Sequence, residues 1–309
     1  MARLRGAAAL LFPVFFGAAL LLFPDVSAAA AREGVALCLQ TVLPSLFPFF
    51  VLSSLLVQSD VPRLLSRAMA GVMYPLFGVS GAGASALILG LLGGYPVGAR
   101  TVAELYGRGE IAREEAEQLL AFCNNSGPGF FLGVCGTAVF GSARAGAYLY
   151  LIHVGAALVT GVLLRRDLGL PRRKAVSRQR APFDLAAALP AAVQSSFAAV
   201  GSVSAFVIFF MVLLRLLSLV PALAALPPLP RAALFGFMEM TNGVNALPAT
   251  RTGFVLCAAI MNWGGLSVQA QTRAMLAGSA LSARRCVTGK AMQALAGVPL
   301  ALLAAQRLF

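Results

Sequence analysis

The stretch Phe122-Cys123-Asn124-Asn125-Ser126-Gly127-Pro128-Gly129-Phe130 interrupts a long apolar run with polar and helix-breaking residues. Pro128 lacks a backbone donor and the glycines relax a helix, so a helix that enters this stretch is expected to break. A second apolar run has a similar interruption at Ile260-Met261-Asn262-Trp263-Gly264-Gly265-Leu266. At membrane depth, irregular backbone is tolerated only where protein or a water-filled cavity satisfies its polar groups. The pair therefore predicts two broken helices around one site.

Composition places both stretches in a membrane protein. The chain has 309 residues, of which 59% are hydrophobic and 11% charged, and its mean hydropathy is +0.85. A soluble domain carries roughly a quarter charged residues, so we expect an all-α polytopic membrane protein. The net charge of +13 does not indicate a nucleic-acid partner, because the basic residues lie between apolar runs and fit the positive-inside rule. The densest group is Arg165, Arg166, Arg172, Arg173, Lys174, Arg178 and Arg180.

The N-terminal segment 1–30 is expected to be a signal-anchor helix. Its apolar run 7–23 follows Arg3 and Arg5 and precedes small residues, which also fits a cleaved signal peptide. Because further spans follow, we favour an uncleaved helix in the lipid bilayer.

The rest of the chain predicts two units of similar order, 34–164 and 190–309, joined by the basic loop 165–185. In each unit a helical hairpin precedes a broken helix. The hairpin is expected to be re-entrant, because each of its arms is shorter than the about 20 residues needed to span a membrane. The hairpins are expected at 82–106 and 231–250, and the broken helices at 113–142 and 252–278. The other spans are expected at 34–57, 146–164, within 190–220 and at 286–305.

These elements give about seven transmembrane helices by length. An odd number of crossings in each unit makes the two units an inverted repeat, as in many secondary transporters. We expect a cell-membrane location with the N-terminus and the loop 165–185 in the cytoplasm and the C-terminus outside. Arg284, Arg285 and Lys290 would then lie on the cytoplasmic side.

Two hairpin tips and two helix breaks are expected to meet near the midplane. Free N–H groups and carbonyls at half-helix ends bind polar groups and cations there. The expected backbone breaks are Gly94, Pro96, Gly127, Pro128, Gly264 and Gly265. The expected ligands of a coupling ion, Na⁺ being the candidate, are Asn124, Asn125 and Ser126. The expected contacts of a small polar solute are Glu239, Thr241, Asn242, Asn262, Ser267 and Asn125.

Individual residues have alternative interpretations. Glu239 lies among Phe237, Met238 and Met240, and an intramembrane carboxylate suggests function, although a tip carboxylate could simply reach water or pair with an arginine. Trp263 suits base stacking and simple packing equally. His153 is expected to be a neutral, hydrogen-bonded helix residue. Arg100 and Glu104 have the i,i+4 spacing of an ordinary ion pair.

Catalysis is not expected. The five cysteines show no metal-ligand spacing and fit small packing residues. A single histidine leaves almost no material for a nucleophilic triad. We therefore predict neither an enzyme nor a tightly bound cofactor, and we leave a homo-oligomer open.

Three motifs carry a family resemblance: Gly94-Tyr95-Pro96-Val97-Gly98-Ala99-Arg100, the stretch 119–128, and Asn262-Trp263-Gly264-Gly265-Leu266-Ser267-Val268-Gln269. From about residue 34 onward the chain resembles the YlbJ family of sporulation integral membrane proteins, which carry the nucleoside-recognition, or Gate, domain. More distantly it is similar to the concentrative nucleoside transporters. That likeness implies a solute contact at Glu239 and at Asn262. The first tip differs, because those transporters have Gln-Thr-Glu where this chain has Gly94-Tyr95-Pro96.

Two hypotheses follow. The first is a transport-type protein that moves a small polar solute of nucleoside-like character with Na⁺ or H⁺ coupling, in the sporulation context that the resemblance implies. The alternative is a non-transporting sporulation membrane factor required for assembly of the spore cortex or envelope.

Overall fold

The computed structural model describes residues 2–167 and 183–309, and within these ranges it contains helices and no strand. Residues 168–182 of the predicted basic loop lie outside the described part. Four helical runs are long and apolar enough to cross a membrane: α8 (Ala143–Leu163), α9 (Leu185–Leu217), α13 with α14 (Arg251–Met275) and α15 (Arg284–Leu308). The expectation of an all-α, polytopic membrane protein is confirmed.

The predicted number of about seven crossings is not confirmed. The described residues give four spans, or up to six if two strongly bent helix pairs each count as one. The predicted spans 7–23, 34–57 and 113–142 are not among the four, and the last of these forms α7 (Arg113–Leu120) and the π-helix η3 (Phe130–Val139). Neither piece is long enough to span a bilayer alone, because a crossing needs about 20 residues.

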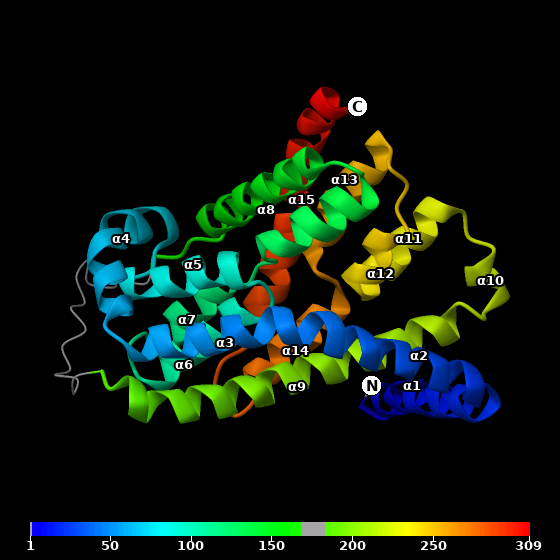
Figure 1. Ribbon diagram of the computed structural model, residues 1–309, viewed down its shortest axis with the longest axis horizontal. Coiled ribbons are helices and arrows are strands. Elements are labelled where there is room, and N and C mark those ends of the chain that lie inside the picture. Colours follow the sequence, from blue (N-terminus) through cyan, green and yellow to red (C-terminus); the bar gives the residue numbers. More distant parts are fainter. Residues whose placement is uncertain (1, 168–182) are drawn as a thin grey trace.

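An elongated layer is formed by the N-terminal helices and α9. It contains α1 (Ala2–Leu22), α2 (Pro24–Leu37), the π-helix η1 (Cys38–Val42) and α3 (Leu43–Gln58). α9 contacts both α2 and α3 and lies alongside them in Figure 1. The wide π turn comes directly before Pro44, which fits the tendency of prolines and π turns to bend helices.

Two short helices flank the first tip. After α4 (Val61–Phe77) and the short η2 (Gly81–Gly83), α5 (Ala84–Gly93) and α6 (Val97–Gly107) pack against each other around the tip at 94–96. The predicted ion pair is present, with Arg100 Nε 2.9 Å from Glu104 Oε1. The Arg100 guanidinium also donates to Ser195 and Ser196 of α9, at 2.9 and 3.2 Å. It therefore ties the hairpin to the elongated layer.

The second hairpin has a tip of a single residue. After α10 (Pro221–Ala224), α11 (Pro228–Met238) and α12 (Met240–Asn245) are separated by Glu239 alone. Thr241 and Asn242 lie in the first turn of α12 rather than in a loop. Helix α14 (Gly265–Met275) starts directly after the break that ends α13 (Arg251–Trp263).

α15 is a central helix of the fold. It packs against α13, α8 and α7, and Figure 1 shows it between the hairpin α5–α6 and the hairpin α11–α12. Each half of the chain therefore has a helical hairpin followed by a broken helix. The division into two units that are inverted in the membrane stays a prediction.

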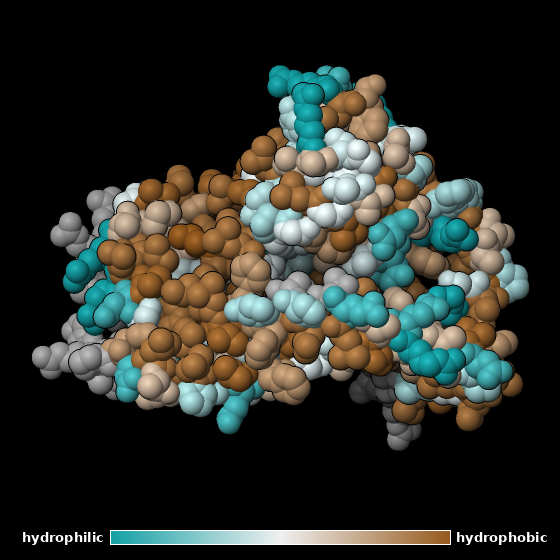
Figure 2. Space-filling model, in the orientation of Figure 1, coloured by the Kyte–Doolittle hydropathy of each residue, from teal (hydrophilic) through white to brown (hydrophobic). Residues whose placement is uncertain are grey.

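The surface agrees with a lipid environment. Hydrophobic residues cover most of the face in Figure 2 that lies over α3 and α5, and hydrophilic residues gather at the rim and at the C-terminal end. Large apolar side chains are exposed on the spans, among them Leu151, Phe197 and Leu303 at 64–66%. Contiguous exposed apolar surface of this kind is rare in soluble monomers and suits contact with lipid.

Candidate functional site

The two hairpin tips and the two helix breaks meet in the folded chain. At the first tip, a Cβ atom on Gly94 would lie 3.0 Å from the backbone nitrogen of Gly127 in the first break. The hydroxyl group of Tyr95, next to Gly94, donates to the Met261 carbonyl at 3.3 Å, close to the second break. At the second tip, a Cβ atom on Gly265 would lie 3.1 Å from Glu239 Cα. Each tip thus contacts a break.

Asn124 connects the first break to two helices. Its Oδ1 accepts the Ala99 backbone N–H at 3.3 Å, and this donor lies in the first turn of α6, where no helix carbonyl is available. Its Nδ2 donates to Thr272 Oγ1 of α14 at 2.8 Å. Asn124 is fully buried, so it holds α6, the first break and α14 together.

His153 bridges the two breaks from α8. Its Nε2 accepts the Ser126 backbone N–H at 3.1 Å, and its Nδ1 lies 2.9 Å from Asn262 Oδ1. Because Nε2 accepts, the neutral ring carries its proton on Nδ1 and donates it to Asn262. This agrees with the predicted neutral, hydrogen-bonded histidine, and it gives the residue a position that the sequence did not indicate.

Lys290 of α15 is enclosed at the centre of the same network. Its side chain is fully buried, and Nζ lies 3.1 Å from Asn125 Oδ1 and 2.6 Å from Gln293 Oε1. The nitrogen also lies 5.0 Å from the centre of the Tyr95 ring. The amide of Gln293 donates in turn to Asn125 Oδ1 at 3.1 Å and to the His153 carbonyl at 3.2 Å. Lys290, which was expected with Arg284 and Arg285 at the cytoplasmic side, is thus enclosed by protein, and the side of the membrane stays a prediction.

Two glycines of α15 allow this helix to pack closely against the two helix breaks. A Cβ atom on Gly289 would collide with the Ala121 carbonyl at the start of the first break, and one on Gly297 would collide with the Asn262 side chain. Glycine has no Cβ atom, so it fits against the Ala121 backbone at Gly289 and against the Asn262 side chain at Gly297. The Lys290 and Gln293 side chains therefore reach Asn125.

Glu239 caps α12. Its carboxylate accepts the backbone N–H groups of Thr241 and Asn242 at 3.1 and 2.8 Å, and the Asn242 side-chain amide at 2.8 Å. A carboxylate at a helix N-terminus is favoured by the free donors and the helix dipole. Glu239 is buried. Its local bonds thus satisfy it, and among the described residues no arginine lies within ion-pair distance, which was one alternative.

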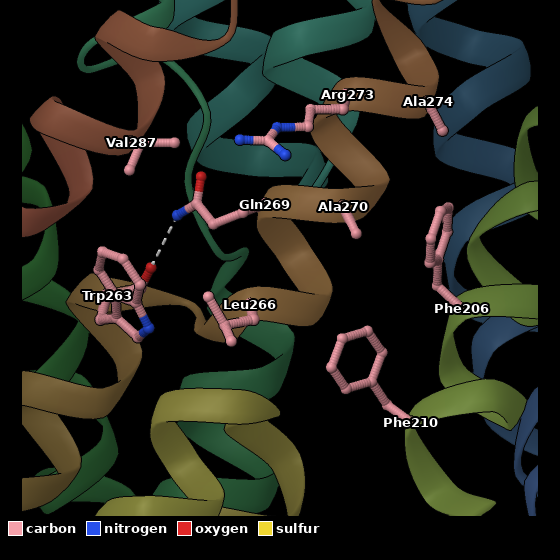
Figure 3. Close-up of a pocket in the computed structure, with 9 residues that line it drawn as sticks. All are labelled: Phe206, Phe210, Trp263, Leu266, Gln269, Ala270, Arg273, Ala274 and Val287. Carbon is pink, nitrogen blue, oxygen red and sulfur yellow. Dashed lines mark hydrogen bonds between the residues drawn. The ribbon is translucent and has the colours of Figure 1, made fainter. Parts of the chain in front are cut away.

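A cavity of about 590 Å³ opens beside the second break, between α9 and α14 (Figure 3). Phe206 and Phe210 of α9 face Leu266 and Ala270 of α14 across it. The remaining lining residues are Trp263, Gln269, Arg273, Ala274 and Val287. Trp263 stacks on Phe237 with the rings 5.2 Å apart and nearly parallel, and its Nε1 donates to the Phe237 carbonyl. The ring therefore packs within the protein and also lines the cavity.

Two polar side chains at this cavity, Gln269 and Arg273, have atoms that can make further hydrogen bonds or ion pairs. Gln269 is buried and donates Nε2 to the Trp263 carbonyl at 3.3 Å, while its Oε1 has no partner among the described residues. Figure 3 shows this oxygen on the side where the Arg273 guanidinium lies. Within residues 2–167 and 183–309, no carboxylate lies within ion-pair distance of Arg273. The cavity is thus lined by a cation and aromatic rings, and an unpaired acceptor is enclosed beside it.

The comparisons with known proteins identify the family. The profile of the Gate family, described as nucleoside recognition, matches residues 39–212, more than half of the chain. The chain belongs to the Gate family. It is also similar to the sporulation integral membrane protein YlbJ of Bacillus subtilis (strain 168), with 30% identity over an alignment 302 positions long, in which 86% of this chain and 74% of the relative are covered. No solved structure matches it significantly.

The resemblance to the YlbJ family is thus confirmed, and the chain is a multi-pass membrane protein of the Gate family. The profile match includes the first hairpin and the first break and ends within α9. The second hairpin and second break lie beyond it. The solute-contacting and ion-binding residues that we expect stay predictions.

In this Gate-family protein, the residues predicted to bind the solute and the ion lie in three separate places. Asn125 and Asn262 join the central network through Gln293 and His153, and Asn124 and Ser126 adjoin it. Glu239, Thr241 and Asn242 form the α12 cap. The Ser267 hydroxyl group is buried without a partner among the described residues.

Sequence analysis missed Lys290, Gln293, Gln269 and Arg273. A usable signal existed for the first two, because Lys290 and Gln293 are three residues apart on one face of a helix whose middle part is mainly apolar. Polar residues within such helices almost always face the protein interior.

Proposed function

We propose that this Gate-family protein binds a small polar solute of the nucleoside class in the cavity between α9 and α14 and moves it across the cell membrane. The observation that carries the proposal is the cavity itself, which adjoins the second helix break and has an unpaired buried acceptor at Gln269. The family description, nucleoside recognition, supports the solute class. The name of the Bacillus subtilis relative supports a role in spore formation.

The chemistry of the lining suits such a solute. Ligand pockets typically measure about 300–1,000 Å³ and combine apolar walls with a few placed polar groups. The aromatic rings of Phe206, Phe210 and Trp263 offer surfaces to a base, the Gln269 oxygen accepts from an amino or hydroxyl group, and Arg273 stacks on or donates to the solute.

The position of the cavity supports movement as well as binding. One wall is α9 of the elongated layer, and the other is α14, which begins at the second break. The layer is tied to the hairpins by a few polar contacts, such as Arg100 with Ser195 and Ser196 and the Asn242 amide with Met211 Sδ at 3.5 Å. Sliding or rocking of the hairpins and breaks against α9 would expose the cavity to each side in turn, driven by a Na⁺ or H⁺ gradient. We assign no catalytic step to the protein.

The test is solute binding and uptake. Purified protein in nanodiscs is titrated with a panel of nucleosides, nucleobases and sugars, and uptake of any ligand found is measured in proteoliposomes with an imposed ion gradient. We expect saturable binding for at least one nucleoside and uptake above that of protein-free vesicles. Absence of binding across the whole panel would contradict the proposal.

Gln269→Leu is expected to weaken solute binding about 10-fold or more, because an unreplaced polar contact in a buried site is worth about 1–3 kcal/mol. The measurement is the dissociation constant in nanodiscs. Gln58→Leu is the matched control, since Gln58 ends α3 away from the cavity and donates to Ser54. Equal affinities of Gln269→Leu and the wild type would remove the cavity from the proposal.

A second candidate function rests on the central network and on the name of the relative. Every polar side-chain atom of Asn125, His153, Asn262, Lys290 and Gln293 has a partner within the described part of the chain, as in a closed structural core. A non-transporting membrane factor of spore cortex or envelope assembly would fit such a core. Complementation of a spore-forming host separates the two functions: a factor tolerates Gln269→Leu and Glu239→Gln when the protein accumulates normally, whereas a transporter with its solute site at the cavity does not tolerate Gln269→Leu.

A further inference from the structure

The Lys290 amine donates to two acceptor oxygens. An ammonium has three N–H donors and no acceptor, and the structure places two amide oxygens and a ring face around it, from Asn125, Gln293 and Tyr95. The orientation of the Gln293 amide is fixed by its own bonds, because its Nε2 donates to Asn125 Oδ1 and the His153 carbonyl. Its oxygen must therefore face the lysine.

The groups around Lys290 carry no compensating carboxylate. The titratable groups that face it are Tyr95 of the first tip, Cys123 of the first break, His153 of α8 and Cys286 one turn earlier on α15. α13 contributes Asn262, which is neutral and bonded to His153. Among residues 2–167 and 183–309, no acidic side chain lies within ion-pair distance of Lys290. An ammonium at Lys290 would thus be a positive charge without a carboxylate partner in the described residues.

This position coincides with the site that the sequence indicates for a metal cation. Asn125 lies in the first break, where free carbonyls and amides of a broken helix can bind Na⁺. In the folded chain, its Oδ1 is already shared by Lys290 and Gln293. A second cation at this oxygen would be repelled by the ammonium in a medium of low dielectric constant.

We propose that Lys290 is a tethered cation that takes the place of a coupling Na⁺ between the two helix breaks, so that neither the folded state nor solute binding depends on Na⁺. The statement on solute binding rests on the proposed function. The statement on the folded state does not, and the two are measured separately.

The first measurement is thermal unfolding of the full-length protein in detergent, in NaCl and in choline chloride at equal ionic strength. The wild-type melting temperature is expected to be the same in both salts, because a ligand that does not bind the folded state does not stabilise it. Lys290→Arg keeps the charge and is expected to behave like the wild type. A rise in the wild-type melting temperature with Na⁺ concentration would overturn the proposal.

Lys290→Ala supplies a converse test. It leaves the Asn125 and Gln293 oxygens and the Tyr95 ring face without their cation, so Na⁺ or methylammonium is expected to raise its melting temperature relative to choline, in proportion to the logarithm of concentration once the site fills. A purely structural lysine predicts a destabilised variant with no response to small cations, and that result would count against the proposal. If this variant does not fold, the comparison of wild type and Lys290→Arg decides.

The second measurement is solute affinity of the wild type in the two salts. A coupled ion typically changes ligand affinity by about fivefold or more, so we expect a change of less than about twofold on replacing Na⁺ with choline. Binding that is strengthened fivefold by Na⁺ would overturn the tethered-cation proposal and leave the transport proposal intact. Absence of any solute binding would instead contradict the proposed function and leave the melting experiments to decide the role of Lys290.

Discussion

Asn125→Leu is expected to lower the free energy of unfolding by about 3 kcal/mol or more. The substitution removes the oxygen that accepts from both Lys290 and Gln293, and losing a buried hydrogen bond to a charged group costs about 1.5–3 kcal/mol on its own. The loss of the hydrogen bond from Gln293 adds to this cost. So does the buried Phe122 carbonyl, which loses its donor, Asn125 Nδ2. The measurement is reversible unfolding in detergent, followed by tryptophan fluorescence of Trp263 or by circular dichroism.

Two comparisons test the physical cause. Asn245→Leu is a matched control at the exposed end of α12 and is expected to change stability by less than about 0.5 kcal/mol. In a Lys290→Met background, Asn125→Leu is expected to cost much less than in the wild type, because no buried charge then loses an acceptor. Equal costs in both backgrounds would show that the ammonium is not the reason for the loss.

Gly289→Ala is expected to destabilise the protein by about 2–3 kcal/mol, the upper part of the range for overpacking a core. The added methyl group would collide with the Ala121 carbonyl, a backbone atom that cannot move aside as a side chain can. Relief of the clash pushes α15 away from the first break and pulls Lys290 from Asn125. The same unfolding measurement applies.

Gly201→Ala is the control for Gly289→Ala. Gly201 also lies inside a helix, α9, but a Cβ atom there meets open space. The alanine is expected to be neutral or to stabilise by about 0.5–1 kcal/mol, because glycine is the poorer helix former. If both alanine variants melted at the wild-type temperature, the close approach of α15 to the first break would be contradicted.

Local chemistry explains why much of the fold was predictable from the sequence. The apolar runs, the hairpin around residues 94–96 and the break at Gly264 follow from hydropathy and from the positions of glycine and proline, which act on their own segment of chain. The first break was harder to delimit, since the helix before it already ends at Leu120. At the second tip, Glu239 caps α12 and brings Thr241 and Asn242 into the helix, because a side-chain acceptor can replace a loop at a helix N-terminus.

The sequence by itself determined that this protein is helical, lies in the membrane and has two interrupted helices, because each of these properties depends on residues that are neighbours in the chain. The tertiary structure alone decided which polar groups meet. Lys290 reaches Asn125 across 165 positions of sequence, and Gln293 reaches His153 across 140. A lysine near a helix start is ordinarily assigned to the membrane surface. Its burial here depends on α15 packing against the first break through Gly289, a contact that only the folded chain brings about.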